Sequence, residues 1–456
     1  MPLQKNQVLT LRVERLSSDG SGVAHSPDGE TVFIPGAAPG DEARVRIVKD
    51  CKRYAFGILD EVLTPSPDRI PVDCAVAGPC GGCSLRHLDY AAELRAKQEN
   101  VADAFARIGG LDVPVLPIVG SPEVNRYRNK VQFPVGVDKS GKPCIGFYAG
   151  RTHRIVPCPD CRLQPGVLNE IGNALCAFFA EKGIQPYSEE TGRGLVRHIF
   201  LRRGAHSGQI MVCLVCTRAK LPSAEELCTR LKAQFAEITT ILLNVNAKNT
   251  NVILGTETHT LYGQGYIEDT LCGVPVQLGP LSFYQVNTLA AEQLYGIAAQ
   301  YAQLTPDDLL LDLYCGMGTI GLSMAAHCRE LIGVEIVPEA IESAKANAAR
   351  MGADVAAKSR FFCADAGQAA TRLAAEGLHP DIVMLDPPRK GCDEATLSAV
   401  VRMSPRRVVY VSCNPATAAR DAAWLEQKGY HAEKVQQVDL FPRTRHCECV
   451  LSFSKV

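Results

Sequence analysis

The feature that most constrains the fold is a regular alternation of apolar strands and helical segments from about residue 306 onward. Each apolar run is followed by a segment of helical periodicity, and the runs are LLLDLYCG, LIGVEIV, RFFCAD, DIVMLD and RVVYVSC. This alternation predicts a doubly wound, mainly parallel α/β sheet, because parallel strands need crossover helices between them. Open sheets of this kind bind ligands at the carboxyl ends of their strands, so functional residues are expected there.

The first 62 residues carry a different pattern. Short alternating runs such as VLTLRVERL and EARVRIVKD, separated by Gly, Asp and Pro turns, predict a small β-barrel over residues 1–62. A Thr-Pro-Ser-Pro segment then favours an extended linker. Strands and helices mix in the middle of the chain. We therefore expect a β-barrel domain at 1–62, a mixed α/β central domain at 70–275 and a Rossmann-like domain at 276–456.

Composition narrows the class of protein. Hydrophobic residues make up 46% of the chain, the formal net charge is −1, and no apolar run is long enough to cross a bilayer. We therefore expect a cytoplasmic protein with no membrane partner, and no obligate protein partner is inferred. The nineteen cysteines are expected to be reduced thiols, because many stand singly in apolar runs and no secretion signal is present.

Acidic residues at successive strand ends indicate the cofactor. The first strand carries Asp312 and runs into a Gly-Met-Gly turn, which lets the backbone approach a ligand but by itself also fits a packing role. The second strand ends at Glu335, suited to ribose hydroxyls, and the third at Asp365, suited to an adenine edge. This set of acids fits a ligand with an amino acid group and a ribose, and favours S-adenosylmethionine over NAD.

The fourth and fifth strands bring Asp386 and Cys413 to the same sheet edge. An isolated Cys is more often an inert core thiol, but the Asn-Pro pair after Cys413 ends the strand and places the thiol at the rim. Uracil C5 is too weak a nucleophile to accept a methyl group until a thiolate adds to C6. Asp386 is the candidate that stabilises the resulting enolate, and Glu448 is the candidate base for the C5 proton.

These motifs resemble the RNA (uracil-5-)-methyltransferase family. The matching segments span 282–448 in the family's order and are Phe-x-Gln-Val-Asn, Asp-x-Tyr-Cys-Gly-x-Gly, Gly-Val-Glu, Asp-Pro-Pro-Arg-Lys-Gly, Ser-Cys-Asn-Pro and Thr-x-His-x-Glu. The resemblance implies that Cys413 attacks C6 and that Glu448 removes the C5 proton. It also implies cofactor contacts from Gln285, Tyr314, Glu335, Asp386 and Asp365. Phe283 is expected either to stack on an extruded base or to be an ordinary core aromatic.

The N-terminal barrel resembles a TRAM domain, an RNA-binding module of OB-like shape. Such barrels bind single strands through basic and aromatic side chains on one face. The candidates here are Arg44, Arg46, Lys52, Arg53 and Tyr54, and the alternative is a merely solvated face.

A second basic run lies at the start of the central region, where Arg126, Arg128 and Lys130 surround an aromatic residue. It matches a Tyr-Arg-Asn-Lys run of the family. Phosphate contact is therefore favoured over a charged surface without a ligand. The target uridine must be unstacked to expose C6, so a loop or locally open RNA is the expected substrate.

A cysteine-rich loop completes the pattern. Four thiolates suit zinc or an iron–sulfur cluster, and a zinc ribbon is the alternative reading. The uracil-5-methyltransferases of ribosomal RNA are similar here and hold a [4Fe–4S] cluster. That resemblance implies the ligands Cys74, Cys80, Cys83 and Cys161, with Cys158 as the alternative fourth ligand.

Three functional classes follow from these patterns. Barrel and cysteine loop together favour large-subunit ribosomal RNA as the substrate, and the runner-up is the transfer-RNA form of the same chemistry. The third class is an RNA-binding assembly factor without activity, which the presence of Cys413, Glu448 and Asp386 disfavours.

Overall fold

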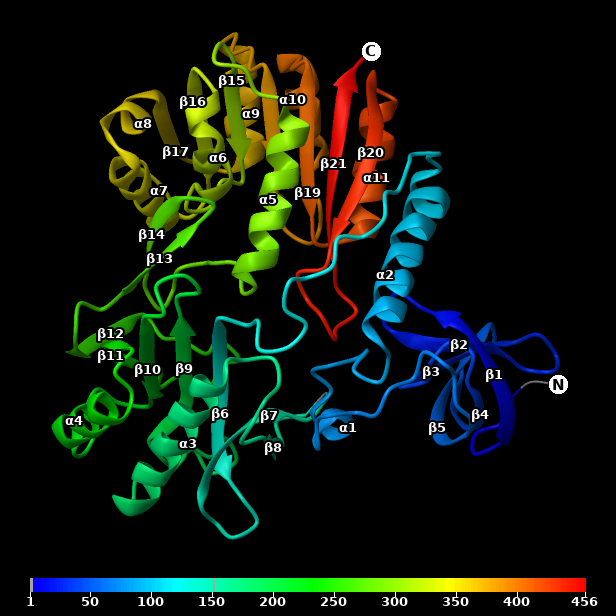
Figure 1. Ribbon diagram of the computed structural model, residues 1–456, viewed down its shortest axis with the longest axis vertical. Helices are drawn as coiled ribbons and strands as arrows, with labels where there is room; N and C mark the ends of the chain where they lie inside the picture. Colours follow the sequence, from blue (N-terminus) through cyan, green and yellow to red (C-terminus); the bar gives the residue numbers. More distant parts are fainter. Residues whose placement is uncertain (1–2, 151) are drawn as a thin grey trace. The chain divides into compact units, whose positions relative to one another are not determined.

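Buried and exposed side chains alternate along much of β4, as a closed barrel requires. The strands are β1 (Val8–Leu16), β2 (Ser21–His25), β3 (Thr31–Pro35), β4 (Glu42–Asp50) and β5 (Tyr54–Thr64). They close in the order β1-β2-β3-β5-β4, drawn in blue in Figure 1. Val32, Val45 and Ile47 fill the interior and are fully buried. Gly57 permits this packing, because a Cβ there would lie 2.3 Å from Val45 Cγ1. The predicted β-barrel is confirmed.

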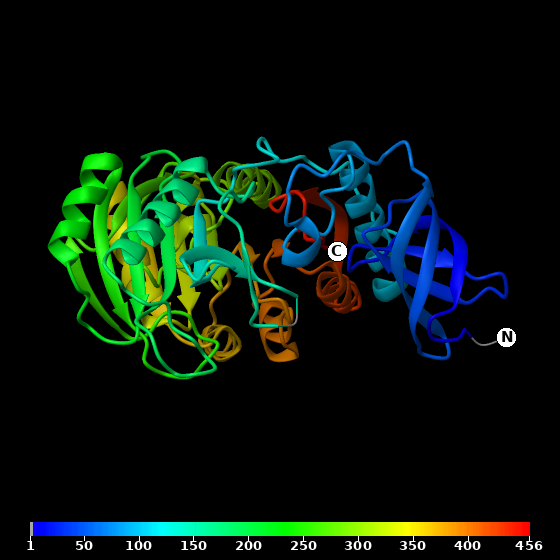
Figure 2. The ribbon, with the colours of Figure 1, turned by 90° about the horizontal axis from the view of Figure 1, so that it is seen from below.

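The computed structural model describes residues 3–150 and 152–456, and these divide into two units. The barrel unit contains the β-barrel and the C-terminal segment; its ranges are Met1–Ala77, Gly81–Val124 and Leu385–Val456. The central unit comprises Gly78–Cys80 and Asn125–Met384. Figure 2 shows the same elements from a second side. The three-domain division expected from the sequence stays a prediction.

Beyond the β-barrel, the barrel unit continues with one long helix and the last elements of the chain. These are α2 (Tyr90–Ala104), a π turn at Phe105–Gly109, α10 (Glu394–Met403), β19 (Arg407–Ser412), α11 (Pro415–Glu426), β20 (Tyr430–Val438) and β21 (Glu448–Lys455). Helix α2 begins at Asp89, whose carboxylate accepts a backbone N–H of the first turn at 2.9 Å. Its π turn packs against α11. A parallel backbone bridge joins Val115 to Val435 of β20. Segments far apart in sequence therefore share one core.

The central unit begins with a mixed sheet, in the strand order β12-β11-β10-β9-β6-β7-β8. Its elements are α1 (Ala77–Cys80), β6 (Lys130–Val137), β7 (Pro143–Tyr148), β8 (Ile155–Pro157), α3 (Gly166–Glu181), β9 (Val196–Arg203), β10 (Ile210–Cys216), α4 (Ala224–Gln234), β11 (Ile238–Val245) and β12 (Glu257–Tyr262). A separate hairpin follows, β13 (Ile267–Leu271) with β14 (Val274–Leu278).

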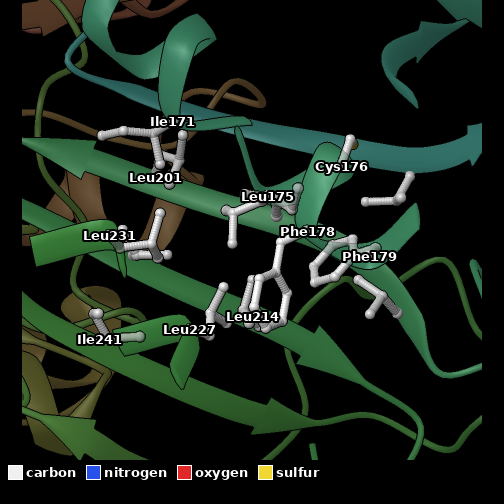
Figure 3. Close-up of a cluster of buried hydrophobic side chains, with 14 of the residues drawn as sticks. Ile171, Leu175, Cys176, Phe178, Phe179, Leu201, Leu214, Leu227, Leu231 and Ile241 are labelled. Carbon is white, nitrogen blue, oxygen red and sulfur yellow. The ribbon is translucent and has the colours of Figure 1, made fainter. Parts of the chain in front are cut away.

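Helices α3 and α4 cover one face of this mixed sheet (Figure 3). Helix α3 contributes Ile171, Leu175 and Phe179, which are fully buried among strand side chains. Helix α4 contributes Leu227 and Leu231 to the same cluster. Burying several such side chains contributes roughly 1.5–3 kcal/mol each, so this layer is a rigid base for the loops that leave the sheet.

The regular strand–helix alternation follows in the central unit. Its elements are α5 (Thr288–Ala302), β15 (Leu309–Leu313), α6 (Thr319–Met324), a 3-10 turn at Ala325–His327, β16 (Glu330–Glu335), α7 (Pro338–Met351), α8 (Ala353–Lys358), β17 (Ser359–Cys363), α9 (Ala366–Ala375) and β18 (Ile382–Leu385). The strand order is β17-β16-β15-β18, and β16 runs parallel to β15 and β17. Because the chain order reverses beside β15, the carboxyl end of that strand is a switch point where ligands bind.

The barrel unit holds the final strands in the order β19-β21-β20. Strand β21 pairs antiparallel with β19 and with β20. The α/β class predicted from the sequence is confirmed.

Candidate active site

The turn after β15 brings its backbone close to the switch point. Tyr314 has a positive φ of 68°, and Gly316 and Gly318 follow with φ values of 55° and 80°, a conformation that favours glycine. A Cβ at Gly318 would lie 3.1 to 3.3 Å from side chains of three neighbouring residues. The positive φ values and the close side chains therefore favour glycine in this turn. Without side chains there, a ligand can approach the backbone at the strand end.

Glu335 ends β16 beside this turn. Its Oε2 accepts the N–H of Gly316 at 3.2 Å, and its Oε1 accepts the N–H groups of Ile336 and Val337 at 2.8 and 3.0 Å. These donors fix the carboxylate at the strand end, where an acid can accept ribose hydroxyls. The structure places Glu335 where the sequence predicts it, and its ribose contact stays a prediction.

The other two acids of the predicted set have structural partners. Asp312 is buried, and its Oδ2 accepts the N–H of Gly321 at 3.0 Å. Asp365 caps helix α9, with its Oδ1 accepting the N–H of Gln368 at 3.1 Å. Both carboxylates therefore stabilise the start of a helix, and the adenine contact of Asp365 stays a prediction.

Asn129 holds the segment that carries Gln285. Its Nδ2 donates to the Gln285 carbonyl at 2.7 Å and to Thr288 Oγ1 at 3.0 Å. Its backbone N–H donates to the Val286 carbonyl at 2.8 Å. The sequence analysis missed this role, because an amide within a basic run carries no signal of a partner 156 residues away.

Arg202 fixes the loop before Gln285. It is buried, and its guanidinium donates to the carbonyls of Gly279 and Ser282 at 2.8 and 2.7 Å. Burial lowers the pKa of Arg202 to about 10. In the loop it supports, the Phe283 side chain is 72% exposed. The alternative that Phe283 is a core aromatic is therefore wrong, and its stacking on a base stays a prediction.

The predicted basic run has three different environments. Arg126 donates to Asp160 Oδ1 at 2.6 Å and to the Cys161 carbonyl at 2.8 Å. Its guanidinium is therefore paired with an acid of the protein itself. Arg128 lies 5.9 Å from the Tyr127 ring centroid. Burial, with the positive charges of Arg202 and Arg128, lowers the pKa of Lys130 to about 8. Phosphate contact by these residues stays a prediction.

In the barrel unit, the strand register places the predicted nucleophile and base side by side. Ser412 of β19 pairs with Cys449 of β21. The neighbouring residues in the two antiparallel strands, Cys413 and Glu448, therefore lie opposite one another on the other face of the sheet. Asp386 follows directly after β18, and it acts electrostatically on both side chains.

These groups shift each other's pKa. Burial raises the pKa of Cys413, the charges of Glu448 and Asp386 raise it further, and a hydrogen bond from Arg389 opposes them. Burial also raises the pKa of Asp386 to about 7. The pKa of Glu448 is well above its usual value, mainly because of burial and then Asp386. Such a cluster of perturbed groups is typical of acid–base and nucleophilic catalysis.

Arg389 is a contact of the nucleophile that the sequence analysis did not single out. Its Nη2 lies 3.1 Å from His446 Nδ1. Its carbonyl accepts from Asn414 Nδ2 at 2.9 Å and from Thr417 Oγ1 at 3.3 Å. The Asp-Pro-Pro-Arg loop is therefore tied to the Ser-Cys-Asn-Pro turn. The Asp-Pro-Pro-Arg motif, in which Arg389 follows Asp386, could have indicated this contact.

A buried ionic network supports the loop that precedes Glu448. Lys97 of α2 donates to Glu93 Oε1 at 2.7 Å and to Asp439 Oδ1 at 2.8 Å, and these side chains are at most 2% exposed. The Arg443 N–H donates to Glu93 Oε1 at 2.7 Å, and its guanidinium donates to the Leu88 carbonyl at 2.7 Å. The two negative charges of the buried carboxylates are thus balanced by the two positive charges of the lysine and the arginine.

The predicted cysteine ligands are divided between the two units, with Cys74 and Cys83 in the barrel unit and Cys80 and Cys161 in the central unit. Among residues 3–150 and 152–456, no group of three or more His, Cys, Asp or Glu side chains is found that could hold a metal ion. The [4Fe–4S] cluster stays a prediction, and no step of the chemistry is derived through one. In the same residues no helix is long and apolar enough to cross a membrane.

Two family models match the chain. Residues 204–456 match tRNA (Uracil-5-)-methyltransferase, and residues 2–59 match the TRAM domain. The second match covers β1 to β4 and the first part of β5.

Curated relatives match over the whole length. An uncharacterized RNA methyltransferase of Halalkalibacterium halodurans is 43% identical over 450 residues, covering 98% of this chain and 97% of that protein. One from Oceanobacillus iheyensis is 41% identical over 451 residues, with the same two coverages of 98% and 97%.

A solved structure matches as well. The tRNA (uracil-54, C5)-methyltransferase of Pyrococcus abyssi, in complex with S-adenosyl-L-homocysteine, gives a TM-score of 0.78 at 27% identity. The match covers 98% of this chain and 100% of that chain.

Proposed function

Because the chain belongs to the tRNA (uracil-5-)-methyltransferase family, and is thus an S-adenosylmethionine-dependent RNA methyltransferase, we propose that it methylates uridine C5 through a covalent Cys413 adduct. The observation that carries this proposal is the register that sets Cys413 opposite Glu448. A thiol and a base at that spacing suit addition to one carbon of the pyrimidine and proton removal from the next.

The first step is addition to the ring. The Cys413 thiolate, stabilised by the hydrogen bond from Arg389, forms a bond to uracil C6. The electron pair of the C5–C6 double bond moves to the C5, C4 and O4 enolate. With a pKa raised to about 7, Asp386 is partly protonated near neutral pH, and its carboxyl group stabilises the charge that develops on O4.

The second step is methylation and release. S-adenosylmethionine would supply an electrophilic methyl group when it is bound. The electron pair of the enolate forms the bond from C5 to this methyl group, and the methyl–sulfur bond breaks, with its electrons staying on the sulfur of the leaving S-adenosylhomocysteine. The Glu448 carboxylate then takes the C5 proton, and its raised pKa makes it a stronger base than an exposed Glu. The pair of electrons left by that proton restores the C5–C6 double bond and expels the Cys413 thiolate. Atoms and charges balance without a further reactant.

We assign cofactor binding to the central unit. Glu335 is fixed by backbone donors at the switch point, and the Tyr314–Gly318 turn leaves the backbone accessible. These residues suit the ribose and the amino acid group of S-adenosylmethionine. Gln285, Tyr314 and Asp365 of the same unit are the further residues that we assign to the cofactor site, and the cofactor contact of Asp386 stays a prediction.

For the RNA, we propose large-subunit ribosomal RNA, which the cysteine pattern of the sequence supports. The barrel does not distinguish the two candidate substrates. The Pyrococcus abyssi enzyme is named as a tRNA methyltransferase, and this chain matches it over 100% of its length. That match makes tRNA the second candidate. The test incubates the purified protein with ribosomal RNA and with tRNA, both isolated from cells that lack this protein. The RNA that gains 5-methyluridine, and the position of that nucleotide, distinguish the two candidate substrates.

The mechanism has a direct test in Cys413→Ala. We expect no methylation of either RNA, with S-adenosylmethionine affinity unchanged by calorimetry, because the thiol acts on the base alone. Turnover by the purified variant would exclude Cys413 as the nucleophile. Cys228→Ala, which removes a buried thiol of helix α4, is the matched control and is expected to retain activity.

A further inference from the structure

Helix α11 directs polar side chains toward the loop of residues 386–392, which carries Arg389. Asn414 Nδ2 and Thr417 Oγ1 both donate to the Arg389 carbonyl, at 2.9 and 3.3 Å. One turn further along the helix, Arg420 Nη2 donates to the Lys390 carbonyl at 3.0 Å. Side chains three or four residues apart lie on the same face of a helix, so this face of α11 holds the backbone of the loop. We call the following four residues the α11 clamp: Asn414, Thr417, Arg420 and Asp421.

Asp421 is the buried centre of the α11 clamp. Its Oδ1 accepts from Arg420 Nε and Nη2 at 2.8 and 2.6 Å. Its Oδ2 accepts the Tyr410 hydroxyl at 2.6 Å and the Cys392 N–H at 2.8 Å. A buried carboxylate is stable only when such donors satisfy it. Asp421 therefore joins α11 to strand β19 and to the end of the loop.

Glycine at position 391 lets the loop lie directly against this ion pair. The φ of Gly391 is 78°, and a Cβ there would lie 2.5 Å from Arg420 Nη2 and 2.6 Å from Asp421 Oδ2. A side chain at this position would therefore push the loop away from α11, because close-packed atoms do not tolerate such contacts. The place of the loop depends on the Arg420–Asp421 pair on one side and on the missing side chain on the other.

The loop presents a cation to the proposed nucleophile. The Cys413 thiol is faced by Glu448 and Cys449 of β21 and by Asp386 and Arg389 of the loop. Burial and the two acids raise the pKa of the thiol, and the hydrogen bond from Arg389 opposes them. Hydrogen bonds weaken steeply as distance and angle depart from the optimum. Stabilisation of the thiolate therefore depends on where the loop holds this guanidinium.

The apolar packing of α11 is a separate set of contacts. Ala418, Ala422 and Leu425 are buried on the adjacent stripe of the helix, and their burial attaches α11 to its unit. Arg420, by contrast, is 53% exposed, and exposed ion pairs contribute little to folding stability. Its contacts with the loop are therefore better explained by the position that they give to Arg389.

We propose that Arg420 and Asp421 are positioning residues for the methylation reaction: they hold residues 389–392 so that the Arg389 guanidinium stays in hydrogen-bond contact with the Cys413 thiolate. Both residues act through Arg389. This inference rests on the proposed function in taking Cys413 as the nucleophile, and it adds what keeps that nucleophile ionised. The reactivity of the thiol is measured without turnover, so the two proposals can fail separately.

The test follows the alkylation of Cys413 by iodoacetamide in the full-length protein as a function of pH, with mass spectrometry of the peptide that carries this cysteine. Arg420→Met is expected to react about 10-fold more slowly than the unaltered protein near neutral pH, which corresponds to a thiol pKa higher by about 1. Gly391→Ala displaces the loop without removing a polar group, and it is expected to shift the profile in the same direction.

Arg230→Met is the matched control, because Arg230 is 48% exposed and pairs with Glu181 at 2.6 Å; its alkylation profile is expected to be unchanged. The double variant Arg389→Met/Arg420→Met is expected to shift the profile no further than Arg389→Met alone, since Arg420 acts through Arg389. Additive shifts would overturn the proposal. An unshifted profile of Arg420→Met, or of Arg389→Met, would overturn it as well.

Steady-state kinetics distinguish positioning from a loss of folding or of RNA binding. Arg420→Met is expected to lower kcat for uridine methylation about 10-fold near neutral pH, with an unchanged KM for RNA. This deficit should shrink as the pH rises and the thiol ionises; a deficit that is the same at every pH would indicate lost structure and would contradict the proposal. If the unaltered protein makes no 5-methyluridine but the alkylation results hold, the proposed reaction fails and the positioning role stands.

Discussion

Lys97 of helix α2 donates a hydrogen bond of 2.8 Å to Asp439, which lies 342 residues later in the chain. Both side chains are buried, and Asp439 starts the loop that leads through Arg443 and His446 to Glu448. The proposed base is therefore anchored, through this loop, to helix α2, which follows the RNA-binding barrel and α1 in sequence. Desolvation lowers the pKa of Lys97, but the charges of Asp439 and Glu93 raise it by more, so the ammonium stays charged.

Lys97→Met is expected to destabilise the protein by about 3–5 kcal/mol, because it leaves the Glu93 and Asp439 carboxylates buried without their shared cation. Urea unfolding measures this loss. Lys345→Met is the matched control, since Lys345 is 52% exposed in its pair with Glu342, and it is expected to cost under about 1 kcal/mol. Similar midpoints for the two variants would contradict the role given to the network.

Glu448→Gln is expected to trap the reaction after methylation, because the amide cannot take the C5 proton and Cys413 cannot leave. A slow-migrating protein–RNA species should accumulate on a denaturing gel and require S-adenosylmethionine for its methylated form. The double variant Cys413→Ala/Glu448→Gln should show none. Rapid turnover by Glu448→Gln without a trapped species would mean that another group removes the proton.

Arg389→Met is expected to shift the rising limb of the pH–rate profile to higher pH. Burial, Glu448 and Asp386 raise the pKa of Cys413, and Arg389 opposes them, so loss of Arg389 raises that pKa further. The thiolate fraction at any given pH then falls, and the rate follows it. The measurement is kcat against pH with saturating RNA. Lys390→Met, which removes the adjacent exposed cation, should leave the limb in place; an unshifted Arg389→Met profile would remove Arg389 from the activation of the thiol.

Iron content tests the cluster that the cysteine pattern implies. We expect anaerobically purified protein to carry about four irons per chain, and we expect Cys161→Ser to lose iron whereas Cys158→Ser keeps it. Elemental analysis and the visible spectrum measure the iron. Colourless protein with stoichiometric zinc would favour a zinc ribbon, and metal-free protein would contradict both assignments.

The amino-acid sequence alone was enough to predict the classes of structure and the places of several candidate residues. Strand and helix periods are local, so the barrel and the α/β sheet could be predicted from neighbouring residues. The strand-end positions of Glu335, Asp386 and Cys413 could be predicted because each residue ends or directly follows an apolar run. These inferences needed no knowledge of which distant segments meet.

How these groups are held became known from the packed chain. The contacts of Lys97 with Asp439 and of Asn129 with Gln285 join residues 342 and 156 positions apart. The local periodicity of hydrophobic residues does not predict such pairs. Packing also decided that Phe283 is exposed and that Arg44 and Arg46 are paired while Tyr54 stands beside other rings. Burial and long-range partners fix pKa, charge pairing and side-chain order, and these arise only once the chain has packed.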